Sequence, residues 1–144
     1  MGAKHEDAKL ILQLYDLRRE AVMREARHWF FREFHPTSAA GILDVLKGEH
    51  SAHYRMVTSY WEMAATLVNH GAIDAEMFNE ANGEHILVFA KVEPYLSELR
   101  QGYGNPRLMA NLEKLARNMP NSEQILKGMR ERLAGMAAAA AKAK

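Results

Sequence analysis

The sequence predicts an all-α protein that folds as a compact bundle of about six or seven helices. Of its 144 residues, 9 are Gly and 4 are Pro, whereas the strong helix formers Ala, Leu, Glu, Lys, Arg and Met are plentiful. Apolar residues recur every three or four positions, which places them along one side of a helix. We expect a single helical domain over residues 1–136, followed by an Ala/Lys-rich flexible tail over residues 137–144.

The N-terminal part predicts one long helix and one short helix. The long helix spans residues 6–34, which contain neither Gly nor Pro, and Pro36 ends it because Pro keeps the preceding residue out of the helical region. The apolar side of this helix drifts, since ~3.6 residues per turn cannot hold a seven-residue repeat. Ser38 is a typical N-cap for a second, short helix that closes at Gly48.

The segment from His50 to His70 predicts the central helix of the bundle. Its apolar stripe is broader than the stripe of a surface helix, which indicates burial on several sides. Gly71 is the residue type expected just past a helix end, and Asp74 is a cap for a short helix that follows. The apolar stripe consists of Tyr54, Val57, Trp61, Ala64, Ala65 and Val68.

The C-terminal part predicts three further helices. The first spans residues 84–101 and is kinked at Pro94, because Pro removes a backbone donor and crowds a carbonyl of the preceding turn. The second begins at Pro106, which follows a cap-forming Asn, and ends at Pro120. The third opens at Asn121 as a variant of the capping box. Its apolar stripe consists of Ile125, Met129, Leu133 and Met136.

The composition argues against several classes of protein. The chain has no Cys, so it has no disulfide framework and no thiolate metal site. No apolar run approaches the ~20 residues of a membrane-spanning helix, and the first residues alternate in charge, so we expect a cytoplasmic protein without membrane contact. The net charge of +1 argues against a nucleic-acid binder, although residues 1–99 carry a net charge of −5 and residues 100–144 a net charge of +6.

A pattern of helix ends and core residues in the middle of the chain resembles a known family. The pattern lies in residues 60–65, 70–74 and 94–100. These residues are similar to a group of small bacterial helical proteins that form a domain of unknown function. Because the shared motifs are caps, a kink and core aromatics, the resemblance implies a helical fold and a bacterial source. It implies no substrate, cofactor or catalytic residue.

Glu62 is the first candidate for a functional site. It lies between Trp61 and Met63 on the expected central helix, whose neighbours are apolar on most sides. A buried carboxylate is costly unless it is paired, and Arg55 or Arg100 could be its partner. We therefore consider a polar pocket around a Glu62–arginine pair, with a structural ion pair or an exposed helix edge as the alternatives.

His50 and His53 form the second candidate site. They lie three positions apart, with Glu49 beside them, so both imidazoles could hold one Zn or Ni ion if another segment supplied a third ligand. The alternative is that they only mark the start of a helix. A carboxylate-bridged di-metal site needs two Glu-x-x-His motifs, and the chain contains one, at Glu25 and His28.

These observations leave two functional hypotheses open. The leading one is a non-catalytic cytoplasmic interaction or scaffold module, because the informative residues serve caps, kinks and packing. Its partner, or a second copy in a homodimer, would bind residues 121–136, whose apolar stripe must be buried against something. The alternative is a sensor or enzyme with a small-molecule or metal site near Glu62 and the pair His50 and His53. We expect no cofactor.

Overall fold

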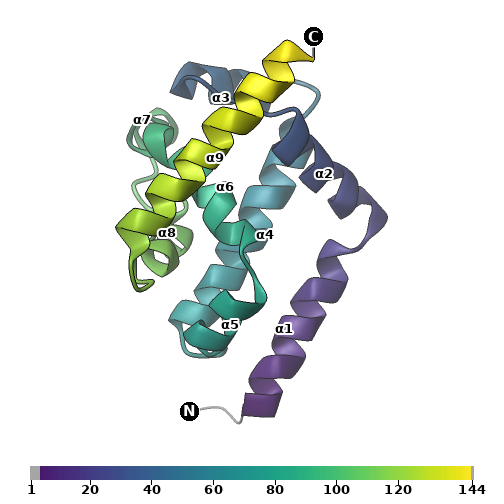
Figure 1. Ribbon diagram of the computed structural model, residues 1–144, viewed down its shortest axis with the longest axis vertical. Helices are drawn as coiled ribbons and strands as arrows, with labels where there is room; N and C mark the ends of the chain where they lie inside the picture. Colours follow the sequence, from purple (N-terminus) through teal and green to yellow (C-terminus); the bar gives the residue numbers. More distant parts are fainter. Residues whose placement is uncertain (1–3, 144) are drawn as a thin grey trace.

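The computed structural model describes residues 4–143, and over this range the chain is helical, with short turns and no strand. The all-α class is therefore confirmed, and Figure 1 shows the helices gathered around α4. The helices outnumber the prediction because two of the expected helices are divided. The observed helices are α1 (Lys4–Arg18), α2 (Ala21–Arg32), α3 (Ala39–Lys47), α4 (Ser51–Asn69), α5 (Ala75–Ala81), α6 (Glu84–Val92), the 3₁₀ helix η1 (Glu93–Tyr95), α7 (Leu96–Tyr103), α8 (Ala110–Arg117) and α9 (Ser122–Lys142).

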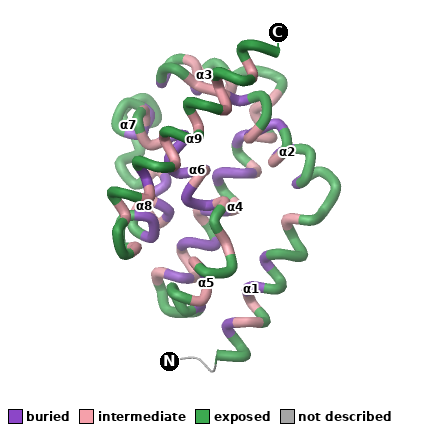
Figure 2. Tube along the Cα trace, viewed as in Figure 1, coloured by how far each residue is buried: buried purple, intermediate pink, exposed green. Residues whose placement is uncertain are grey.

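Helix α4 is the centre of the bundle, as its broad apolar stripe predicts. It packs against α2, α3, α5, α6 and α8. The largest fully buried side chains come from α4 and three of these neighbours: Trp61, Phe30, Phe78 and Phe89 are each at most 1% exposed. Figure 2 shows buried positions along α4 and α6, whereas most of α1 is exposed. The core is thus built around one helix that is covered on most sides.

A partly buried ion pair joins α2, α4 and α6. The Arg27 guanidinium of α2 donates hydrogen bonds to both carboxylate oxygens of Glu84 at the start of α6, the shortest at 2.7 Å. The Trp61 indole N–H of α4 donates to the same carboxylate at 3.0 Å. The bond to Glu84 raises the pKa of Arg27 further above its ordinary value. Three helices are therefore fixed to one another at a single carboxylate.

The single helix expected over residues 6–34 is wrong, because the chain breaks at Arg19 and Glu20 into α1 and α2. The Glu20 backbone is extended, and its carboxylate accepts a hydrogen bond from the Met23 amide at 2.9 Å, which caps α2. Helix α1 packs against both α2 and α5. A straight helix with a drifting apolar side could not bury both of its ends, and the break lets each half bury its own face.

Helix ends that depend on local chemistry are confirmed. Ser38 caps α3 by accepting a hydrogen bond from the Gly41 amide at 2.9 Å. Asp74 caps α5 by accepting one from the Met77 amide at 2.8 Å. Gly71, just past the end of α4, has a φ of +82°, a conformation that costs little only for Gly. Each of these residues acts on backbone groups that lie only a few positions away in the sequence.

Pro94 interrupts the helix expected over residues 84–101. Helix α6 ends at Val92, and η1 carries the proline before α7 begins at Leu96. The tighter 3₁₀ turn accommodates the missing backbone donor of the proline. The predicted kink is thus confirmed, as a short change of helix type.

One predicted helix start is wrong, and so is one predicted cap, although α9 begins directly after Asn121 as expected. Helix α8 begins at Ala110 rather than at Pro106, because the Asn105 side chain accepts a hydrogen bond from the amide two residues later, at 3.0 Å, and closes a turn instead. Asn121 precedes α9 with a left-handed φ of 58°, and its side chain makes no capping hydrogen bond. In both places the chain reverses direction before the helix starts.

Helix α9 lies along α6 and α8 and continues through residues 137–142 of the expected tail. Whether that tail is flexible stays a prediction. The apolar stripe of α9 packs partly against the core of its own domain. Within the part of the chain that the structure describes, no helix has both the length and the apolar character needed to cross a membrane.

Candidate functional site

A cavity of about 500 Å³ opens beside α4, between α3, the end of α7 and the turn that precedes α8. We call it the α4 cavity. Two residues selected from the sequence, Glu62 and Arg55, line it together. Arg100, His50 and His53 are not among its lining residues. These are Leu46, Tyr54, Arg55, Thr58, Ser59, Glu62, Tyr103, Leu108 and Met109.

Glu62 binds the start of α8 and not an arginine. One carboxylate oxygen accepts a hydrogen bond from the Leu112 amide at 2.8 Å, and the other accepts from the amide and the side chain of Asn111 at 3.1 and 3.2 Å. No ion pair joins Glu62 to an arginine in the described residues 4–143. The expected pair with Arg55 or Arg100 is therefore wrong, because the unpaired amides and the positive end of the α8 dipole satisfy the carboxylate.

The α4 cavity also carries the buried hydroxyl of Thr58 and the exposed guanidinium of Arg55. The Thr58 hydroxyl donates a hydrogen bond to the Tyr54 carbonyl of its own helix at 2.9 Å. The methyl group of Thr58 therefore remains as its apolar contribution to the cavity wall. The Arg55 guanidinium makes one long contact, from Nε to the Ser51 carbonyl at 3.4 Å, and pairs with no acidic side chain in the range that the structure describes. A ligand in the cavity would therefore meet Arg55 as its cationic group.

Two tyrosines add phenol groups to this cavity. Tyr54 is 7% exposed and Tyr103 is 48% exposed. Burial raises the pKa of Tyr54 above its usual value, and burial also raises the pKa of Tyr103 against the opposing effect of the Arg55 charge. Both phenols therefore stay protonated at neutral pH, where each can donate or accept one hydrogen bond.

Arg100 has a structural role at the turn between α7 and α8. Its guanidinium donates to the Leu108 carbonyl at 3.0 Å and to the Glu113 carboxylate at 2.9 Å. The Glu113 side chain also accepts from Arg117 at 3.2 Å. Arg100 therefore supports one wall of the α4 cavity from behind without reaching into it.

His50 and His53 face α2, away from the α4 cavity. The ring of His50 stacks on the Trp29 indole with centroids 5.1 Å apart, and the two imidazole centroids are 5.8 Å apart. Among residues 4–143, no group of three or more His, Asp or Glu side chains is arranged to hold a metal ion. The structure thus brings the two histidines together with an aromatic ring and supplies no third ligand.

Lys91 is a chemically distinctive residue that the sequence analysis did not select. It is 6% exposed, and its ammonium donates to the carbonyls of Phe30 and Phe34, at 2.6 and 2.5 Å, where α2 ends. Burial lowers the pKa of Lys91 to about 8. The sequence does contain an indication that Lys91 is buried, because it is the one charged residue in the otherwise apolar run from Ile86 to Val92.

Replacing Glu62 tests its role as the anchor of α8. We expect Glu62→Gln to lower the free energy of unfolding by about 1–3 kcal/mol, because a neutral amide has one acceptor oxygen and no charge to offer the α8 amides. Urea unfolding followed by circular dichroism measures this change. The matched control is Glu98→Gln on exposed α7, which should change stability by less than about 0.5 kcal/mol. Equal stabilities of the two variants would contradict the anchoring role.

Lys91 predicts a specific pH dependence of stability. Below pH 8 Lys91 is charged in both the folded and the unfolded chain, so the full cost of burying the ammonium is present. Between pH 8 and 10.5 the folded chain loses this proton first, so the free energy of unfolding should rise relative to Lys91→Met by up to about 3 kcal/mol. Denaturant unfolding of both proteins at several pH values measures the difference between their free energies of unfolding. Both proteins contain the same tyrosines, so the effect of tyrosine titration cancels in this difference. A difference that is constant from pH 7 to 10.5 would contradict the burial of a charged Lys91.

The comparison with known proteins gives a family and no function. Residues 3–119 match the family model described as "Domain of unknown function (DUF4760)". No curated protein and no solved structure matches the chain. The matched segment includes α1 to α8, and α9 begins after it. Since the match covers most of the 144 residues, the chain belongs to the DUF4760 family of uncharacterised domains.

Proposed function

We propose that this domain is a non-catalytic ligand-binding module whose α4 cavity takes an apolar molecule with one acceptor group. The observation that carries the proposal is the cavity itself. Its volume of about 500 Å³ falls within the ~300–1,000 Å³ typical of small-molecule sites, and five of its nine lining residues are aliphatic or aromatic. We propose a cytoplasmic location for the module, as the sequence suggests.

The side chains around the α4 cavity favour binding over catalysis. Glu62, the acid that could have served in proton transfer, is held by three hydrogen bonds to α8. Arg55 and Tyr103 are exposed at the rim, whereas Tyr54 and Met109 are buried. A ligand would therefore place its apolar part inward and its acceptor group against Arg55 and Tyr103.

The fluorescent probe 8-anilinonaphthalene-1-sulfonate tests the α4 cavity, because it combines aromatic rings with one anionic group. We expect one probe to bind per chain. Ser59→Phe should weaken binding at least tenfold, since Ser59 lines the cavity from an exposed position and can take a larger side chain without disturbing the core. Fluorescence titration of the folded protein measures the affinity.

The matched control for this experiment is Ser97→Phe, the same substitution at an exposed position of α7 that does not line the cavity. This variant should bind the probe as the unmodified chain does. If Ser59→Phe binds the probe as tightly as Ser97→Phe, the probe lies elsewhere and the proposal for the α4 cavity fails.

An interaction role, the leading hypothesis from the sequence, is the second candidate function, and we propose it for α1 as well as for residues 121–136. The apolar stripe of α9 is already partly covered by its own domain. In contrast, Leu12 is 65% exposed and Tyr15 is 45% exposed, and their spacing places them on one face of α1. We propose that this face binds a second copy of the chain.

Size-exclusion chromatography with light scattering tests self-association through α1. We expect the unmodified chain to show a mass above that of a monomer at high concentration, and the double variant Leu12→Ser, Tyr15→Ser to be monomeric. Leu17→Ser is the control, because Leu17 is 58% exposed but lies on a different side of α1. A monomeric mass for all three proteins at every concentration would rule out this dimer.

A further inference from the structure

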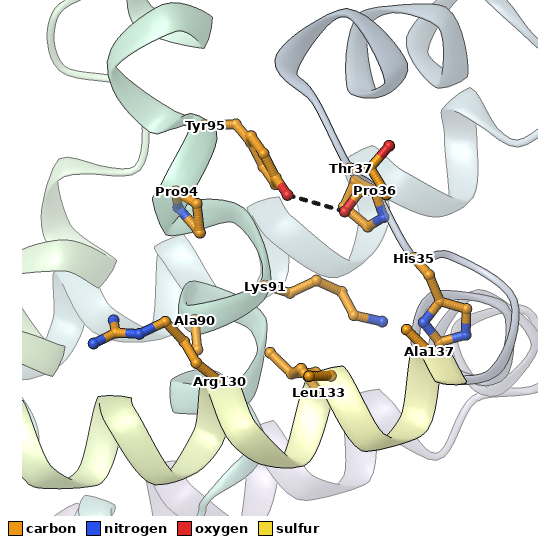
Figure 3. A pocket seen from close by; sticks show the side chains of 11 residues that line it. His35, Pro36, Thr37, Ala90, Lys91, Pro94, Tyr95, Arg130, Leu133 and Ala137 are labelled. Atoms are coloured by element: carbon orange, nitrogen blue, oxygen red, sulfur yellow. Dashed lines mark hydrogen bonds between the residues drawn. The ribbon is translucent and has the colours of Figure 1, made fainter. Parts of the chain in front are cut away.

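A second cavity, of about 250 Å³, surrounds the amino group of Lys91. Figure 3 shows it between three parts of the chain: the turn after α2 with His35, the α6–η1 junction with Lys91, and α9 with Leu133 and Ala137. We call it the Lys91 cavity. It shares no lining residue with the α4 cavity, so the two sites are separate.

The Lys91 ammonium has one hydrogen that the protein does not use. Two of its three donors go to the carbonyls of Phe30 and Phe34. The rings of these two residues lie 5.2 and 5.6 Å from Nζ and face it with their π electrons. No carboxylate pairs with Lys91 in the described residues, and no Asp or Glu lines its cavity. The positive charge is therefore buried without a negative partner, which is costly.

The other ionisable groups of the Lys91 cavity are also cationic or already engaged. Arg130 lines it from α9 and is 40% exposed at the side chain, with the Glu93 carboxylate at 3.9 Å as a loose partner. His35 contacts a backbone carbonyl through Nε2 at 3.1 Å. The Tyr95 hydroxyl donates to the Pro36 carbonyl at 3.1 Å, the bond drawn in Figure 3. The Arg130 guanidinium points away from the Lys91 ammonium in Figure 3, so Lys91 is the cation that a ligand in this cavity meets, and no Asp or Glu lines the cavity.

The rest of the lining is apolar and the space is small. Six of the eleven lining residues are apolar: Pro36, Ala90, Pro94, Leu133, Ala134 and Ala137. The volume of about 250 Å³ lies below the ~300–1,000 Å³ range of sites for drug-sized molecules, so an occupant has only a few carbon atoms. A phosphate would leave its oxygens unpaired against these walls, whereas a molecule with an apolar chain would cover them.

We infer that the Lys91 cavity binds a short-chain carboxylate, with the carboxylate at the Lys91 ammonium and the carbon chain along α9. The carboxylate accepts the unused Lys91 hydrogen and supplies the missing negative charge. The chain fills the apolar space beside Leu133 and Ala137. This binding site is independent of the α4 cavity and goes beyond the function proposed for it.

Butyrate is the probe for this site, and its neutral analogue butyramide is the matched control ligand. We expect isothermal titration calorimetry of the full chain to show one butyrate per chain and at least tenfold weaker binding of butyramide, which has the same shape without the charge. Lys91→Met should weaken butyrate binding at least tenfold. Equal affinity for butyrate and butyramide would overturn the proposal, as would inorganic phosphate binding as tightly as butyrate.

A second pair of variants keeps the test independent of any folding defect in Lys91→Met. Ala137→Phe fills the Lys91 cavity from α9, whereas Ala138→Phe makes the same change at the next, exposed position outside the lining. Butyrate affinity should fall at least tenfold in the first variant and stay unchanged in the second. If Ala137→Phe is folded by circular dichroism and still binds butyrate as Ala138→Phe does, the carboxylate does not occupy this cavity.

Discussion

Three buried or half-buried charges in this domain contact the backbone ends of helices. The carboxylate of Asp7, which is 5% exposed, accepts a hydrogen bond from the amide of Asp74, the cap of α5, at 2.9 Å. Glu62 accepts from amides in the first turn of α8, and Lys91 donates to the carbonyl of Phe30 in the last turn of α2 and to that of Phe34 just after the helix. In each case the sign of the charge matches the helix dipole, negative at an N-terminus and positive at a C-terminus. Removal of such a side chain would leave helix ends unsatisfied in the interior.

This constraint explains where the two cavities lie. A side chain that reaches a helix end holds that end at a fixed distance from its own helix, and the space beside the contact is not filled by close helix packing. Glu62 sets the start of α8 against α4, next to the α4 cavity. Lys91 sets the end of α2 against α6, next to the Lys91 cavity. The two contacts differ in one respect. Both carboxylate oxygens of Glu62 accept hydrogen bonds, whereas one of the three N–H donors of Lys91 has no acceptor in the described residues.

The sequence predicts the parts of the fold that depend on neighbouring residues. The bounds of α3, α4 and α5 and the interruption at Pro94 follow from caps, Gly71 and proline chemistry. The break at Glu20 does not, because it serves the packing of α1 on α5, a contact between distant segments. Glu62 could be recognised as a carboxylate in apolar surroundings, but its partner could not. Backbone amides have no signature in the sequence, so an arginine was the visible candidate.

The two cavities also differ in how they relate to the family. Every residue that lines the α4 cavity falls within residues 3–119, the segment that matches the family. The wall of the Lys91 cavity formed by Arg130, Leu133 and Ala137 comes from α9, which lies beyond that segment. The Lys91 cavity is therefore formed where α9 packs on the family core, and not within the core alone.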